Sequence, residues 1–383
     1  MSQPSTRVAL FLRYFGGGGA DLAMAYLARG FVERGLQVDF VLSQAGGNHL
    51  WKIPPEVRIV DLGSFNNGAT LKALIRYLQQ ERPAALLSAL HFTNEIAVLA
   101  KRLSGVSTRV VVCEQNTLSK RSRHETKLSK RLTPWLARLT YPSADAVVAV
   151  SKGVARDLSQ TLGLPEHRMQ VIYNPAVTPE LAAKAQEPVE HPWFAPGEPP
   201  VILGVGKLEP QKDFPTLIRA LAEVRQQQPA RLMILGWGPD ENRQQLEALI
   251  QSLGLTANVA LPGYVNNPFA YMARAAVFAL SSRWEGLPFV LVEAMAVGTP
   301  VVATHCESGP DEILDQGKYG ALVPVGDSQA LAAAILKTLA QPRQSIDPAW
   351  LDQFSLDTIT QQYLEVLGVS QKPDNCYQGL SAL

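Results

Sequence analysis

Short apolar segments that alternate with stretches of helical spacing run through this sequence in two successive series. The first series occupies residues 8–13, 38–43, 84–90, 109–113 and 146–150, and the second occupies residues 201–206, 231–235, 259–261, 277–280, 300–303 and 321–323. Continuous apolar strands separated by helices are typical of parallel sheets that are covered on both faces. The sequence therefore predicts an α/β protein made of two doubly wound, Rossmann-like units.

The length of the chain sets the number of domains. A chain of 383 residues exceeds one ordinary core and fits two domains of roughly 150–200 residues each. Residues 175–200 are rich in Pro, Ala and Glu, which favours a linker. We expect an N-terminal domain at 1–174 and a C-terminal domain at 201–349. In 350–383 we expect a helix at 350–367 that packs back on the N-terminal domain, followed by a tail.

Charge and cysteine content exclude several classes of protein. The net charge is +1, so the chain as a whole is not a binder of polyanions. The cysteines, Cys113, Cys306 and Cys376, form no CxxC pair, which argues against a disulfide framework or a zinc site and fits the cytoplasm. No apolar run reaches the ~18 residues that a membrane-spanning helix needs. We predict a cytoplasmic protein, with peripheral contact to the inner face of the plasma membrane left open.

Two lysines follow the first apolar segment of the second series. Lys207 and Lys212 lie between a predicted strand and a predicted helix, and ligands of parallel α/β sheets bind at the carboxyl ends of strands. A lysine ammonium is a compact charge with three donors, which suits a diphosphate. We predict that both side chains bind a diphosphate, with two solvated loop lysines as the alternative.

A second loop and helix follow the predicted strand at 277–280. Gly286 permits a tight turn and Pro288 suits a first helical position, so the amides at the start of this helix form an anion site. Glu293 lies within an apolar helix, where a carboxylate needs a partner. Ribose hydroxyls would satisfy it, and so would a structural ion pair with Arg or Lys.

Two features of the first half lie where the other side of a cleft is expected. The glycine run at 16–19, which includes Gly17 and Gly18, lets backbone approach a bound phosphate or a second ligand, or forms a flexible turn. His91 follows an apolar segment and could orient a ligand hydroxyl; the alternative is a structural histidine.

Residues 118–139 concentrate positive charge on an amphipathic pattern. Seven lysines and arginines stand against Glu125 alone, and leucines recur at helical spacing beside Trp135. Such a segment suits an anionic membrane surface or a lipid diphosphate acceptor. The alternative is a solvated helix whose leucines pack on the N-terminal domain.

Taken together, these segments resemble the family 4 glycosyltransferases, whose GT-B fold has two Rossmann-like domains facing across a cleft. The resemblance covers residues 7–365. It depends on Glu285 and Glu293 at the family's E-x7-E spacing, on the runs 293–304 and 308–313, and on the shorter runs 149–155 and 171–175. The resemblance implies retaining transfer of a hexosyl group from a UDP- or GDP-sugar, with a glycan or polyprenyl-diphosphate acceptor in envelope polysaccharide synthesis.

The resemblance also implies roles for the domains and for individual residues. The N-terminal domain would bind the acceptor, and the C-terminal domain would bind the nucleotide-sugar. Lys207 and Lys212 would hold the diphosphate, Glu293 the ribose hydroxyls, and Glu285 would lie by the sugar and its reacting carbon. The nucleobase of the donor would lie near Gly263 and Tyr264. The sugar or phosphate would contact the amides of Phe289, Val290 and Leu291.

Three positions depart from the family pattern. Lys207 stands where arginine is usual, which keeps the charge and loses the bidentate fork. Phe289 stands where asparagine is frequent, which puts a sugar contact in doubt. Gln115 stands where many members carry histidine. Because glutamine cannot act as a general base, we do not assign the role of that histidine to Gln115.

The sequence predicts catalysis without a metal or a cofactor, with the nucleotide-sugar as a substrate. No two aspartates are separated by a single residue, so the lysines and helix amides would stabilise the leaving diphosphate.

Several alternatives remain open from the sequence: a transferase for a small soluble acceptor, a GT-B epimerase, or a non-catalytic nucleotide-sugar-binding subunit. An NAD-dependent dehydrogenase is disfavoured, because no G-x-G-x-x-G follows the first strand.

Overall fold

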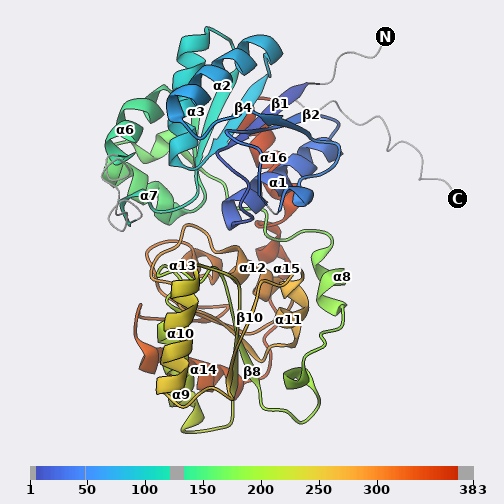
Figure 1. Cartoon of the computed structure of the whole chain (residues 1–383), viewed down its shortest axis with the longest axis vertical. Helices are drawn as coiled ribbons and strands as arrows, with labels where there is room; N and C mark the ends of the chain where they lie inside the picture. The colour runs from blue at the N-terminus through green and yellow to red at the C-terminus, as the bar shows by residue number, and fades with distance from the viewer. Residues whose placement is uncertain (1–5, 48, 121–132, 370–383) are drawn as a thin grey trace, which may run out of the picture.

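The computed structural model describes residues 6–47, 49–120 and 133–369, which form two lobes stacked along the long axis of the molecule (Figure 1). The first lobe is built on a seven-stranded sheet, with every strand pair parallel and the order β3-β2-β1-β4-β5-β6-β7. Its strands are β1 Arg7–Leu12, β2 Gln37–Leu42, β3 Arg58–Asp61, β4 Ala85–Ala89, β5 Arg109–Glu114, β6 Ala146–Ala149 and β7 Met169–Val171.

The second lobe repeats this architecture with six parallel strands in the order β10-β9-β8-β11-β12-β13. Its strands are β8 Val201–Val205, β9 Arg231–Leu235, β10 Val259–Gly263, β11 Val277–Leu280, β12 Val301–Thr304 and β13 Ala321–Val323. Two Rossmann-like sheets confirm the predicted fold class. In each sheet the strand order reverses once, between β1 and β4 and between β8 and β11, and such a point is where this architecture places ligands.

Helices connect the strands by crossovers that cover both faces of each sheet. The first lobe contains α1 Gly19–Glu33, α2 Asn67–Glu81, α3 His91–Ser104, α6 Thr133–Thr140 and α7 Lys152–Leu162, with short 3-10 turns η1 Leu50–Lys52, η2 Tyr141–Ser143 and η3 Glu166–Arg168. The second lobe contains α9 Phe214–Arg225, α10 Asp240–Ser252, α11 Pro268–Arg274, α12 Phe289–Ala296, α13 Pro310–Ile313 and α14 Ser328–Leu339.

The segment between the lobes is structured. It carries α8 Leu181–Gln186 and η4 Pro192–Phe194, and α8 packs against α11 of the second lobe. In Figure 1 this segment runs down one side of the molecule. Asn267 Nδ2 donates to the Lys184 carbonyl at 2.8 Å, which fastens α8 to the start of α11.

The helix predicted at 350–367 is two helices, α15 Pro348–Asp352 and α16 Leu356–Leu367, so the single helix was wrong. Ser355 interrupts it, because its side chain accepts from Thr358 N and caps α16. Phe354, which is fully buried, accepts from Val177 N at 3.0 Å, and Leu356 N donates to the Val177 carbonyl at 2.9 Å.

Although it ends the described chain, α16 packs against α1 and β5 of the first lobe, as Figure 1 shows. The contact is close, because a Cβ placed on Gly30 of α1 would lie 2.2 Å from Oγ1 of Thr360. Arg109 Nε donates to the Val366 carbonyl at 2.9 Å. The chain therefore crosses between the lobes twice, which limits how far they can separate.

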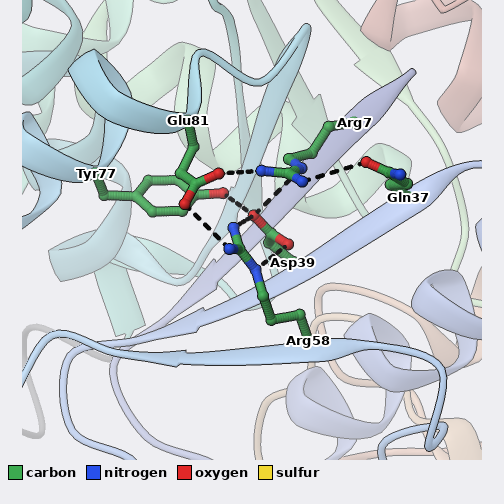
Figure 2. A network of polar contacts seen from close by, with 6 residues as sticks. All are labelled: Arg7, Gln37, Asp39, Arg58, Tyr77 and Glu81. Carbon is green, nitrogen blue, oxygen red and sulfur yellow. Dashed lines mark hydrogen bonds and ion pairs between the residues drawn. The ribbon is translucent and has the colours of Figure 1, made fainter. Parts of the chain in front are cut away.

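An ionic network of six residues links the first three strands of the first sheet with α2 (Figure 2). Asp39 of β2, which is buried, accepts from Tyr77 at 2.7 Å and from Arg58 Nε at 2.9 Å. Glu81 pairs with Arg58 at 3.0 Å and with Arg7, and the Arg58 hydrogen bond lowers the pKa of Glu81. This cluster lies at the amino ends of β1, β2 and β3, and we interpret it as stabilising the fold.

Candidate active site

The loops after β8 and β11 are tied together at the point where the order of the second sheet reverses. Ser281 Oγ donates to the Lys212 carbonyl at 2.7 Å, and Arg283 N donates to the Gln211 carbonyl at 2.8 Å. Asp213 adopts a left-handed backbone, with φ 46°, and pairs with Arg283 at 3.1 Å. These bonds fix the backbone of both loops and therefore the positions from which their side chains extend.

Two of the predicted site residues contact each other directly. Lys212 Nζ lies 2.6 Å from Oε1 of Glu285, and Ser282 Oγ donates to the same oxygen at 2.6 Å. Gln211 Nε2 donates to Oε2 of Glu285 at 3.3 Å. Glu285 is buried at 5% exposure, so these three donors replace the water that an ionised carboxylate would otherwise need.

Lys207 lies at the boundary between the lobes. Its Nζ is 5.3 Å from the centre of the Trp237 ring and 3.5 Å from the position that a Cβ on Gly18 of the first lobe would take. Trp237 follows Gly236, where any Cβ would lie 1.8 Å from the Gly206 carbonyl oxygen. Trp237 was not predicted; its signal was the glycine beside it at the end of β9.

The glycine run of the first lobe is ordered by a carboxylate. Asp21 accepts from the amides of Gly16 and Gly18, both at 3.0 Å. Burial raises the pKa of Asp21, and the Gly18 amide and the Lys207 charge oppose this shift. Gly17 has φ 74° and lies against His49. The amides of Gly16 and Gly18 therefore bind Asp21, while the loop itself faces Lys207.

Helix α12 starts close to the other lobe. Pro288 is its N-cap and not its first helical residue, and the Leu291 amide donates to the Pro288 carbonyl at 3.1 Å. Phe289 and Val290 thus supply the amides of the first turn. A Cβ on Gly19 of α1 would lie 3.5 Å from the Phe289 ring, so Phe289 packs against the first lobe.

Glu293 is buried in α12 at 5% exposure. Among residues 6–47, 49–120 and 133–369, none donates a hydrogen bond to its carboxylate, and burial raises its pKa to about 8, opposed by the charge of Lys52. A buried carboxylate without donors is costly unless a ligand supplies them. The predicted alternative of a structural ion pair is not formed within the described chain.

The remaining predicted residues come from both lobes. Gly263 ends β10 with φ 88°, and Tyr264 next to it lies 5.1 Å, ring to ring, from His49 of the first lobe. His91 is the first residue of α3 at the carboxyl end of β4. It is buried, and its ring lies 4.3 Å from the Phe92 ring at a tilt of 46°.

A set of polar contacts joins the lobes beside the site. Glu312 of α13 accepts from the amides of Lys152 and Gly153, both at 2.8 Å, which caps α7 of the first lobe. Ser151 and Ser308 share a hydrogen bond of 2.6 Å, and Lys120 pairs with Glu307 at 2.9 Å.

Two facing Rossmann-like sheets with cationic side chains at the reversal point of the second define a GT-B protein. The chain belongs to glycosyltransferase family 4. Residues 17–178 match the family described as Glycosyltransferase Family 4, and residues 199–341 match the one described as Glycosyl transferases group 1. The chain is therefore a retaining glycosyltransferase that uses a nucleotide-sugar.

Relatives agree with this assignment. The lipopolysaccharide core biosynthesis glycosyltransferase LpsE of Rhizobium meliloti is 32% identical over 62% of this chain and 68% of its own. A Campylobacter jejuni transferase, N-acetylgalactosamine-N,N'-diacetylbacillosaminyl-diphospho-undecaprenol 4-alpha-N-acetylgalactosaminyltransferase, is 29% identical over 88% of this chain and 90% of its own. The crystal structure of Anabaena HepE in complex with UDP-glucose has the same fold, with a TM-score of 0.77 at 22% identity over 94% of this chain and 99% of that one.

Proposed function

We propose that the chain transfers a hexosyl group from a UDP-sugar to a polyprenyl-diphosphate-linked or glycan acceptor in envelope polysaccharide synthesis. The observation that carries the proposal is that Lys207 and Phe289 at the start of α12 both lie against the glycine loop of the first lobe, with Lys212 on the same loop as Lys207. Two ammonium groups and helix amides in this region would suit a diphosphate. The names of the Campylobacter and Anabaena relatives support the lipid-linked acceptor and the UDP donor, respectively.

Breaking the sugar–phosphate bond leaves negative charge on the nucleoside diphosphate. In this proposal Lys207 and Lys212 face that charge, together with the amides of Phe289 and Val290. Preorganised donors of this kind stabilise a transition state because they need no reorganisation as charge develops. Glu285 lies by the sugar, where its carboxylate faces the oxocarbenium character of the reacting carbon.

The nucleoside half of the donor extends toward β10 in this proposal. Glu293 accepts hydrogen bonds from the ribose hydroxyls, which supply the donors that its carboxylate lacks. Gly263 and Tyr264 lie by the nucleobase of the donor. The glycine loop at Gly17 and Gly18 closes over the diphosphate from the first lobe, next to Lys207.

On the acceptor side, His91 orients the attacking hydroxyl in this proposal. A cavity of 660 Å³ is lined by Trp284, the residue before Glu285, and its walls carry Lys120 from the first lobe and Arg283 from the second. These two cationic side chains suit the diphosphate of a lipid-linked acceptor.

The surface of α3 and α6 suits contact with a membrane. These helices pack together, yet Trp135 and Leu103 are 61% and 62% exposed. Leu99, Leu136 and Leu139 are exposed beside them, at 38%, 38% and 55%, so the last two leucines pack only partly on the first lobe. Residues 121–132, which hold most of the predicted basic charge, lie outside the described residues. None of the described helices is long and apolar enough to cross a bilayer. We place the protein at the inner face of the plasma membrane, with this patch on anionic lipid.

The donor is tested with a thermal-shift panel of UDP, GDP, ADP and their sugars. Specific ligands raise the apparent stability by mass action, so UDP compounds should raise Tm most. Product analysis of UDP-sugars with and without a lipid-linked acceptor then tests transfer. A stronger shift with GDP, or epimerised sugar without acceptor, would contradict the proposal.

The membrane contact is tested by flotation with vesicles of neutral or anionic lipid. Binding should increase with the anionic fraction and fall in a Leu103→Ser, Trp135→Ser variant. Binding that is independent of lipid charge, or unchanged in the variant, would contradict the docking surface and leave the transfer reaction in place.

A further inference from the structure

The loop that carries Glu285 packs backbone against backbone on the first lobe. A Cβ placed on Gly286 would lie 2.1 Å from the carbonyl oxygen of Gln115 and 3.0 Å from Cα of Asn116. Gln115 directly follows β5, so its carbonyl lies at the carboxyl edge of the first sheet. Because no flexible side chain separates the two backbones, any shift of the Gln115 carbonyl moves this loop relative to the first lobe.

Gly286 is also linked to the first lobe through its own carbonyl. This carbonyl accepts a hydrogen bond from Ser308 Oγ at 2.9 Å, and Ser308 shares a hydrogen bond of 2.6 Å with Ser151 of the first lobe. The carboxylate of Glu285 is held separately, by three donors of the second lobe. The contacts of Gly286 therefore fix a different quantity, which is the place of the Glu285 loop relative to the first lobe.

The side chain of Gln115 is bound through both atoms of its amide. Oε1 accepts a hydrogen bond from Asn174 Nδ2 at 2.9 Å, and Nε2 donates to the Cys113 sulfur at 3.3 Å. The same sulfur lies 3.2 Å from the Tyr363 hydroxyl. All four residues are buried, so these bonds replace the contacts with water that buried polar groups lack.

The partners of Gln115 come from the two segments that cross between the lobes. Asn174 directly precedes the segment that carries α8, and Tyr363 belongs to α16, which follows the second crossing. Gln115 thus connects both crossings to the point where the Glu285 loop rests on the first lobe. A change in the arrangement of the lobes reaches that loop through one buried side chain.

We propose that Gln115 is a positioning residue for transfer, which sets the place of the Glu285 loop against the first lobe and thereby the distance between the donor sugar and the acceptor. The inference rests on the proposed function, since it requires the sugar beside Glu285 and the acceptor on the first lobe. Displacing Gln115 leaves the donor bound and misplaces it relative to the acceptor. A misplacement of about 1 Å costs on the order of 10²-fold in rate.

The test compares transfer with donor binding and with the slow hydrolysis of the UDP-sugar in the absence of acceptor. Gln115→Ala removes both bonds of the amide, so kcat for transfer should fall on the order of 10²-fold. UDP affinity in calorimetric titration and the rate of hydrolysis should stay at wild-type values. A general defect of the fold would lower all three quantities, so the ratio of transfer to hydrolysis identifies a loss of positioning.

Two asparagines beside the same linker give a matched comparison. Asn174→Ala removes the partner of Gln115 and should lower the ratio of transfer to hydrolysis in the same direction as Gln115→Ala. Asn267→Ala removes a hydrogen bond of 2.8 Å to the Lys184 carbonyl, which fastens the linker and does not involve Gln115. It is the control and should leave this ratio and UDP affinity unchanged.

A rescue variant keeps the test decisive even if Gln115→Ala does not fold. Gln115→Asn shortens one amide and should lose transfer, and adding Asn174→Gln restores the combined length and should recover most of it. Equal losses of transfer and UDP affinity, undiminished transfer in the Gln115 variants, or no rescue would overturn the role of Gln115 alone. A wild type that neither binds UDP nor transfers its sugar would overturn the proposed function and this inference together.

Discussion

Lys212 Nζ and Oε1 of Glu285 are 2.6 Å apart, and Ser282 Oγ donates to the same carboxylate oxygen at 2.6 Å. One ammonium therefore neutralises the buried carboxylate before a donor arrives. In the proposed function, the same ammonium would serve both the carboxylate and the leaving phosphate of a bound donor. This pairing would link binding of the diphosphate to Glu285, which is proposed to lie by the sugar.

Replacing Lys212 should impair the chemical step. Lys212→Ala removes a donor to the leaving group and leaves Glu285 without its cation, so kcat should fall on the order of 10²–10³-fold. Lys337→Ala, on an exposed position of α14, is the matched control. Steady-state transfer assays measure both, and near wild-type turnover in Lys212→Ala would remove this side chain from the mechanism.

Gly17 should resist substitution more than other glycines with the same backbone. Gly17→Ala places a methyl group 2.5 Å from the His49 ring and also strains the backbone, whose φ is 74°. Gly63→Ala is the control, because its φ is 75° and nothing lies within 4 Å of its Cβ. Both variants should lose about 1 kcal/mol of stability to backbone strain.

Gly17→Ala alone should also lose donor affinity, because it displaces His49, which lies against Tyr264. Thermal unfolding and UDP titration measure the two effects. Equal behaviour of the two variants toward UDP would show that the contact with His49 has no part in donor binding.

Glu312 should matter for the closed arrangement of the lobes. It caps α7 across the boundary, with bonds of 2.8 Å to two amides. Asp327 caps α14 within one lobe through Ala330 N and gives the matched control. Each alanine variant should lose about 1 kcal/mol of helix capping.

Only Glu312→Ala should raise the radius of gyration in solution scattering. It should also lower kcat/KM, roughly tenfold if the closed arrangement loses about 1.4 kcal/mol of stability relative to the open one. If Asp327→Ala has the same effect on turnover, then general stability and not the contact between the lobes explains the result.

The candidate residues that the sequence singled out are those whose signal is local. Lys207, Lys212 and Glu293 could be named as candidates because each follows or lies within an element that its own apolar pattern defines, and the structure places them at or in those elements. Helix α16 was merged with α15, since the apolar pattern continues through the break and only the cap at Ser355 marks it. Asp21 lies three residues after the N-cap Gly18, where an acidic residue is typical of a helix start, so its hydrogen bond with the Gly18 amide could have been predicted from the sequence.

Contacts between distant segments could not be predicted from local patterns. His49 lies far from Tyr264 in the chain, and the 5.1 Å approach of their rings depends on how the two lobes face each other. Trp237 and Lys207 belong to the same lobe but follow different strands, and they meet where the backbone at Gly236 passes against Gly206. Contacts of both kinds follow from the packing of elements and leave no periodic trace in the sequence.

The leaving group should be stabilised without a divalent ion. The lysines and the amides of α12 supply the positive charge in the proposed site, so activity should persist in excess chelator. Transfer rates with EDTA, and with manganese added back, measure this. Activity that chelation abolishes and manganese restores would contradict the proposed role of Lys207 and Lys212.

Glu95 of α3 should make the stability of the protein depend on pH. Its Oε1 is buried with no hydrogen-bond partner among the described residues, and burial, with the charge of Glu114, raises its pKa from 4.5 to about 8. Between these two values the folded chain binds one proton more than the unfolded chain. Stability from this group is therefore complete below pH 4.5 and is lost as the pH rises to about 8.

Glu95→Gln removes this dependence, because the amide does not ionise. Relative to the wild type, the variant should gain stability as the pH rises, reaching roughly 1–3 kcal/mol at pH values above the folded pKa. Denaturant unfolding of both proteins at acidic, neutral and alkaline pH measures the difference. Glu365→Gln, at an exposed position of α16, should show no such trend. A constant difference between Glu95→Gln and the wild type across the range would mean that Glu95 ionises in the folded protein as it does in water.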